Sequence, residues 1–151
     1  MDAREFKELF SDVAIANGFA AAHGGWFRES PECVVVLDLQ KSNFGNYFEL
    51  NIKVFVQGLF GHRYTRTKQM VKNLPGDVFL RPPARHKLSL DLDSVGSRDE
   101  GRAALEGLFQ DFVTPTTVDA LSRTGLVSLS ARGLVHLLPA VRRELQTASD
   151  S

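Results

Sequence analysis

The sequence predicts an α+β fold: an antiparallel sheet of about four strands in meander order, with N-terminal and C-terminal helices packed on one face. Three observations support this prediction. Residues 34–57 hold two runs with apolar side chains at every second position, as in half-buried strands. The first 16 residues and the last third of the chain show the wider apolar spacing of amphipathic helices. Helices that flank a run of strands favour α+β over an alternating α/β order.

The 151 residues fit one domain, which we expect to span residues 1–147, with a frayed tail at residues 148–151. No apolar stretch approaches the ~20 residues that a membrane span needs. The N-terminus lacks the apolar segment of a secretory signal, and the single cysteine, Cys33, cannot form an internal disulfide. We therefore expect a cytoplasmic protein that does not contact a membrane.

The first helix is indicated by an apolar stripe near the N-terminus. The stripe consists of Phe6, Leu9, Phe10, Val13 and Ala14. Asp2 and Glu5 form a capping-box pattern at its start, and Asn17-Gly18 supplies a residue able to adopt positive φ at its end. A short strand is expected next, at residues 26–30, because Gly24-Gly25 and Pro31 break the chain on either side.

The two central strands carry a polar stripe that alternates with their apolar side chains. The stripe consists of Asp38, Gln40, Ser42, Tyr47, Glu49, Asn51 and Lys53. A four-residue loop at 43–46 would set Asp38 opposite Asn51 and Gln40 opposite Glu49, whereas a six-residue loop would set the like charges of Asp38 and Glu49 opposite each other. We prefer the shorter loop. An antiparallel sheet with helices on one face shows its other face to water, so we expect a mainly solvent-exposed stripe.

The middle of the chain, residues 59–85, shows no sustained periodicity, so we expect a long and partly irregular connection. Residues 87–93, KLSLDLD, then alternate cleanly and predict a fourth strand with its leucines facing inward.

The last third of the chain is predicted to be helical. Ser97 and Glu100 form a second capping-box pattern, Thr114-Pro115 is expected to end that helix and start another, and Gly125 is expected to close the latter. A final amphipathic helix is described by Leu134, Leu137, Leu138, Val141 and Leu145. Pro139 must either kink this helix or begin it anew.

Several short motifs resemble a bacterial group, domain-of-unknown-function family 4304. They are Asn17-Gly18-Phe19, Trp26 to Arg28, Leu39 to Ser42 and Asn51-Ile52, with His62 to Arg66 matching a family motif that holds His and Arg. The chain departs from the family at Lys53, where many relatives carry glycine. The resemblance covers the first two-thirds of the chain. It implies the strand order and a bacterial origin, and it implies no activity.

The charge distribution singles out one segment for function. The chain as a whole is balanced, but residues 59–87 hold seven basic residues and one acidic residue, a net charge of +6. Aromatic residues between these cations suit phosphate contact and base stacking, and the segment equally suits an acidic protein partner. Because nucleic-acid-binding domains are usually basic overall, zero net charge disfavours that class.

We therefore predict a non-catalytic protein-binding module that uses the outer sheet face and the basic segment 59–87. The candidate contact residues are His62, Arg63, Tyr64, Arg66, Lys68, Gln40, Glu49 and Asn51. The partner is expected to be another protein, and no cofactor, metal or catalytic residue is expected. The four histidines lack metal-ligand spacing, and Cys33 lies in an apolar run that would keep its thiol unreactive.

Two alternatives stay open. A phosphate-substrate hydrolase or nuclease would use His62 or His86 with Asp91 or Asp93, while the basic residues hold the phosphate. A non-catalytic nucleic-acid binder would depend on the same +6 segment.

Overall fold

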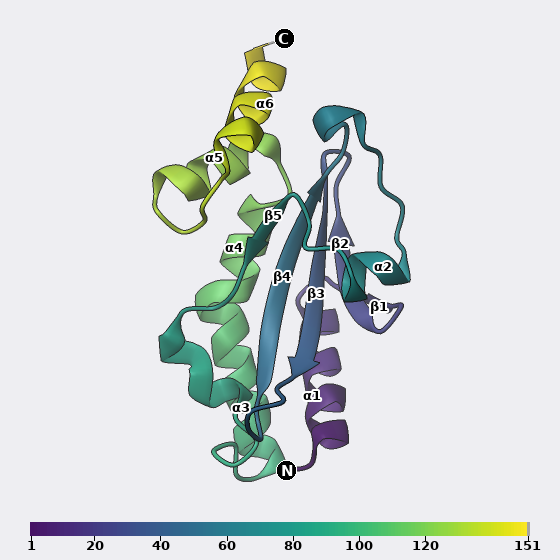
Figure 1. The fold of residues 1–151 in the computed structure, drawn as a ribbon. Helices are drawn as coiled ribbons and strands as arrows, with labels where there is room; N and C mark the ends of the chain where they lie inside the picture. The colour runs from purple at the N-terminus through teal and green to yellow at the C-terminus, as the bar shows by residue number, and fades with distance from the viewer. Residues whose placement is uncertain (151) are drawn as a thin grey trace.

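The structure of the chain, a computed structural model, describes residues 1–150, with side chains described up to residue 147. It forms a five-stranded antiparallel sheet in the order β1-β2-β3-β4-β5 (Figure 1). The strands are β1 (Ala20–Ala22), β2 (Gly25–Glu29), β3 (Cys33–Lys41), β4 (Phe48–Val56) and β5 (Val78–Leu80). The predicted α+β class and meander order are confirmed, with five strands rather than about four. The tail expected at 148–151 lies outside the residues with described side chains.

The helices are α1 (Ala3–Ala16), α2 (Lys68–Lys72), α3 (Arg98–Leu108), α4 (Thr114–Asp119), α5 (Arg123–Ala131) and α6 (Pro139–Asp150). Short helical turns lie between β4 and α2 (η1, Leu59–Gly61), between β5 and α3 (η2, Ala84–Leu90), and between α3 and α4 (η3, Phe109–Val113). The N-terminal and C-terminal helices pack on one face of the sheet, called here the inner face, and α2 lies on the outer face (Figure 1).

Helix α1 begins and ends where its sequence predicts. The Asp2 carboxylate accepts the Glu5 amide at 2.8 Å and caps the first turn. At the other end Gly18 adopts φ +94°, and the Phe19 amide donates to the Ala14 carbonyl at 3.1 Å. Every member of the predicted apolar stripe is buried.

The predicted register of β3 and β4 is confirmed. Asp38 lies opposite Asn51, and Gln40 lies opposite Glu49. The Ser42 amide donates to the Tyr47 carbonyl at 2.9 Å, which leaves residues 43–46 as the four-residue loop.

The prediction of a strand at residues 87–93 is wrong. Residues 84–90 form the 3₁₀ turn η2, Leu88 is exposed, and only an isolated bridge between Tyr47 and Asp91 joins this region to the sheet. Strand β5 instead forms earlier, inside the connection expected to be irregular. Pro82 and Pro83 cannot donate to a strand ladder, so the chain leaves the sheet directly after β5.

Thr114-Pro115 does not end the helix as expected. Helix α3, the π-helical turn η3 and α4 follow one another without a break, and Thr114 keeps helical φ/ψ angles. In the π turn the Thr114 amide donates to the Phe109 carbonyl, so the helical path continues up to Pro115, which has no amide to donate. Gly125 does not close a helix either: its amide donates to the Ser122 hydroxyl at 2.9 Å in the first turn of α5. Pro139 begins α6 anew.

The sheet carries an apolar core on each face. The larger core lies between the inner face and the helices that cover it. The smaller core, on the outer face, consists of Phe27, Val34, Val36, Phe55, Met70 and Val71. The expectation of a solvent-exposed polar stripe is therefore wrong for Asp38, Asn51 and Lys53, which are 7%, 5% and 4% exposed. Residues of α2 contact Asp38 and Lys53, and Arg81 contacts Asn51.

Candidate functional site

A buried lysine anchors α2 to the outer face of the sheet. Lys53 Nζ donates to the Val71 carbonyl at 2.6 Å and to the Met70 carbonyl at 3.4 Å, both in the last turns of α2. It also lies 3.9 Å from Asp38 Oδ2. Burial lowers the pKa of Lys53, while the Asp38 carboxylate opposes this shift. Lys53 thus satisfies carbonyls that a five-residue helix leaves without partners.

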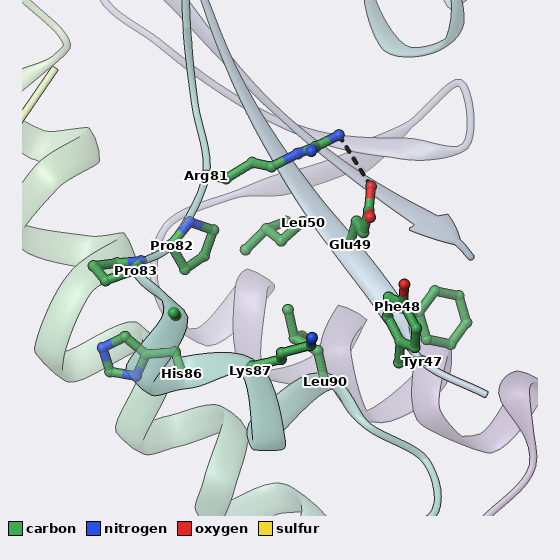
Figure 2. Close-up of a pocket in the computed structure, with 11 residues that line it drawn as sticks. Tyr47, Phe48, Glu49, Leu50, Arg81, Pro82, Pro83, His86, Lys87 and Leu90 are labelled. Atoms are coloured by element: carbon green, nitrogen blue, oxygen red, sulfur yellow. Dashed lines mark ion pairs between the residues drawn. The ribbon is translucent and has the colours of Figure 1, made fainter. Parts of the chain in front are cut away.

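The polar network extends from Asp38 through Asn51 to Arg81. The Asn51 amide nitrogen donates to Asp38 Oδ2 and to Gln40 Oε1, both at 3.1 Å. The Asn51 amide oxygen accepts from Arg81 Nε at 2.9 Å. Arg81 also forms an ion pair with Glu49 at 3.0 Å, drawn as a dashed line in Figure 2. Of the three predicted contact residues of the sheet, Glu49 and Asn51 therefore contact Arg81, and Gln40 is linked to it through Asn51.

A cleft of about 640 Å³ opens beside this network. It is called here the cationic cleft, and it is lined by Lys7, Asp38, Leu39, Gln40, Lys41, Asn51, Lys53, Lys72, Asn73, Leu74, Pro75, Phe79 and Arg81. Five of these side chains are cationic, and one is a carboxylate. Leu74 and Phe79 add half-exposed apolar surface. The cleft thus combines an excess of positive charge with an apolar rim.

The cations of the cleft differ in how far they are neutralised. Lys72 lies 4.0 Å from Asp38, and Arg81 is paired with Glu49. Lys7 and Lys41 have no ion pair among the residues with described side chains: Lys7 lies over the Phe48 ring at 5.7 Å, and Lys41 Nζ donates to the Gly45 carbonyl at 3.1 Å. Positive charge therefore remains available to an anionic ligand.

A second, smaller hollow of about 200 Å³ lies between β4 and η2 (Figure 2). Its walls are mainly apolar, from Phe48, Leu50, Leu90 and the Pro82-Pro83 pair, and Arg81 borders it as well. His86 belongs to this wall, but Figure 2 shows its imidazole turned away from Leu50 and Leu90. Its ring lies 6.4 Å from that of Phe112, and its buried Nε2 has no hydrogen-bond partner among the described residues.

The predicted contact residues of the basic segment lie outside the cationic cleft. Tyr64 packs on Phe55 at 5.0 Å and donates its hydroxyl to Asp77 at 3.3 Å. Burial, followed by the Asp77 carboxylate, raises the pKa of Tyr64 to about 12. Arg66 pairs with Glu29 at 3.2 Å and lies over the Phe27 ring. These contacts bind the segment to the sheet.

The remaining three predicted contacts of the segment are exposed. His62 and Arg63 follow η1, beyond the C-terminal end of β4, where the His62 carbonyl accepts the Gly58 amide at 2.6 Å. Lys68 stands in the first turn of α2 and has no ion pair within residues 1–147.

The histidines of the hydrolase alternative are not brought together. His62 follows the C-terminal end of β4, whereas His86 shares a hollow with Tyr47 and Phe48 at its N-terminal end. Asp93 accepts from the Asn46 side chain at 2.8 Å. Within the described part of the chain, no group of three His, Cys, Asp or Glu side chains could hold a metal ion.

The sequence alone does not single out the cations that line the cleft. Lys72 and Arg81 are part of the basic segment 59–87, and Lys7 and Lys41 lie outside it. One signal was present: Lys53 lies between Ile52 and Val54 in an apolar strand. A lysine buried in such a strand requires partners, which points to a covered polar network.

The comparisons with known proteins bear on the family and not on an activity. In the described part of the chain, no helix is both long and apolar enough to cross a membrane. No curated protein matches the chain, and no solved structure matches it. A family profile with the description "Domain of unknown function (DUF4304)" matches residues 10–117, from within α1 to within α4. The chain therefore belongs to the DUF4304 family.

Proposed function

We propose that this chain is a non-catalytic binding module whose cationic cleft receives an acidic segment of a partner protein. The observation that carries the proposal is the excess of cations in a single cleft, where Lys7 and Lys41 have no ion pair within residues 1–147. Acidic side chains would neutralise this excess, and Leu74 and Phe79 would contact apolar atoms of the same segment. The buried network of Lys53, Asp38 and Asn51 keeps the floor of the cleft in place before binding.

A protein ligand is favoured over a nucleic acid because an aromatic and a cationic side chain that could bind nucleic acid already contact other residues of the chain. Tyr64, which could have stacked on a base, packs against Phe55 instead. Arg66 is held by Glu29. The whole chain has no net charge, which leaves little long-range attraction for a polyanion.

The experiment measures the binding of a labelled, end-blocked peptide in which glutamate alternates with leucine, by fluorescence anisotropy at low and at physiological salt. We expect binding that weakens with salt, because the contacts are ionic and near the surface. A labelled single-stranded oligonucleotide of equal charge is the comparison. Tighter binding of the oligonucleotide would assign the cleft to nucleic acid and refute the proposal.

Two lysines of α2 provide a matched pair of variants. Lys72 lines the cationic cleft, whereas Lys68, on the same short helix, does not. Lys72→Gln should weaken peptide binding about 3- to 10-fold, or ~1 kcal/mol, while Lys68→Gln should change it less than about twofold. Equal losses of peptide affinity in the two variants would show that the peptide is attracted to the positive charge of the surface as a whole. That result would exclude the cleft as the binding site.

A further inference from the structure

We infer that the acidic segment binds as an added β-strand along the free edge of β3, an inference that rests on the proposed function. The pairing of β3 is asymmetric along its length. Strand β4 accompanies it from Cys33 to Lys41, but β2 accompanies it only as far as Leu37, which lies opposite Trp26. Residues 38–41 therefore have a neighbouring strand on one side only.

The hydrogen-bond pattern shows which backbone groups face this free edge. The Ser42 amide donates to the Tyr47 carbonyl on the β4 side. Alternate residues of a strand direct their backbone groups to the same side, so Asp38 and Gln40 also direct theirs toward β4. The Ser30 amide donates to the Cys33 carbonyl, which places the odd-numbered residues of β3 on the β2 side. Leu39 and Lys41 thus direct their amides and carbonyls to the side on which no strand of the described chain pairs with them; Lys41 is exposed there, whereas Leu39 is buried.

Cations flank the free edge on both faces of the sheet. Lys72 stands on the outer face beside Asp38, and Lys7 projects from α1 on the inner face. Lys7 also borders a shallow hollow of about 450 Å³, which Ser11, Gly25 and Trp26 help to line. The cationic cleft and this hollow therefore adjoin at Lys7, one on each face of the position that an added strand would take.

This arrangement defines the chemistry of the occupant. Successive side chains of a strand point to opposite faces, so acidic residues at every second position would face Lys72. The residues between them would face Lys7 and the hollow beside Trp26, where apolar side chains fit. A second copy of this chain does not match, because pairing two such edges would bring Lys41 and its neighbouring lysines against the same cations.

The test uses three end-blocked peptides in which glutamate alternates with leucine. The first is unmodified, the second carries N-methyl groups on the glutamates only, and the third carries them on the leucines only. Alternate amides of a strand point to opposite edges, so strand addition requires only one of the two sets. One methylated peptide should bind at least about tenfold more weakly than the unmodified peptide, and the other should bind nearly as well.

Two measurements on the protein accompany the peptide series. Amide hydrogen exchange, followed by NMR, should slow about tenfold at Leu39 and Lys41 when the unmodified peptide saturates the protein, while the amide of Gln40, already paired with β4, should change little. Lys41→Pro, which removes an outward amide, should bind the peptide more weakly than Lys41→Gln, which removes only the charge. Thermal melts establish that both variants fold.

The outcomes separate the mode of binding from the function. If all three peptides bind equally, with loss only in Lys72→Gln, strand addition is refuted and the acidic-segment function stands. If none binds, both fall. Peptide-induced pairing of two protein molecules through β3, detected by light scattering, would also overturn the inference.

Discussion

The two faces of strands β3 and β4 are built from the same alternating pattern and are stabilised in different ways. The inner face buries a continuous apolar core against the helices. The outer face changes character along its length: Val34, Val36 and Phe55 form the small core under α2, and Asp38 and Asn51 continue it as a polar network. Alternation therefore shows that a strand has two faces, but the composition along each face decides what can cover it.

The two faces also differ in how they contribute to the stability of the fold and to the candidate site. On the inner face, stabilisation comes from apolar area removed from water. On the outer face, polar groups must keep their partners, since an unpartnered buried charge costs far more than a lost apolar contact. The cationic cleft opens on the outer face, where the chain holds fixed charges close to solvent.

The largest losses in the free energy of unfolding are expected when one aromatic side chain on each face is replaced by alanine. Phe10 contacts Trp26 at 4.7 Å and Phe109 at 5.4 Å in the inner core, so Phe10→Ala should lower the free energy of unfolding by about 3–5 kcal/mol. Phe55→Ala should cost about 3 kcal/mol, because α2 is short and can close over the gap. Urea denaturation measures both losses. A larger loss at Phe55 would show that the outer core dominates stability.

An effect no larger than that of Phe55→Ala is expected from breaking the polar network. Lys53→Met leaves the buried Asp38 with only the half-exposed Lys72, and it removes the donor to the Met70 and Val71 carbonyls. It should cost about 3 kcal/mol. The double variant Asp38→Leu with Lys53→Met removes both charges and should recover at least about half of this loss. Arg66→Met, which breaks the half-exposed pair with Glu29, is the control and should cost less than about 1 kcal/mol. A double variant as unstable as Lys53→Met would refute the account of the outer face.

The last effect appears only at alkaline pH and involves one residue on each face. Burial raises the pKa of Cys33 from 9.0 to about 12 on the inner face, and burial with Asp77 raises that of Tyr64 from 10.0 to about 12 on the outer face. A raised folded-state pKa favours the neutral form. The resulting stabilisation is present in full below the unfolded pKa and is lost as pH rises toward 12. Melting temperatures should therefore fall above pH 9, and less steeply in Cys33→Ala and Tyr64→Phe.

Local signals explain which parts of the fold could be predicted from the sequence. The capped helix α1 and the β3–β4 register depend on neighbouring residues and on pair charges, and both were predicted correctly. Residues 87–93 were predicted wrongly, because an alternating leucine pattern does not record that the preceding prolines take the chain out of the sheet. The predicted helix boundary at Thr114-Pro115 is wrong for a similar reason. A π turn lets the helical path continue through a proline that normally marks the end of a helix.

The sequence indicates only some of the residues that line the candidate site, because the others are brought to it by the tertiary fold. Gln40, Glu49 and Asn51 belong to one strand pair; Glu49 and Asn51 contact Arg81, and Gln40 is linked to it through Asn51. Lys7 and Lys41 reach the cleft from a helix and a strand end far from the basic segment, and no sequence window joins them. The basic segment was selected for its charge, but Arg66 and Lys72 pair with acids of the sheet.

Arg81 forms part of the wall of both hollows, the cationic cleft and the apolar pocket beneath η2. Its guanidinium is held by Glu49 and Asn51 and lies over the Phe79 ring at 5.5 Å. An acidic ligand in the cationic cleft that drew the Arg81 guanidinium away from Glu49 would narrow the cleft and widen the apolar pocket. Occupancy on the outer face of the sheet would then be communicated, through a single side chain, to the packing of η2 against β4.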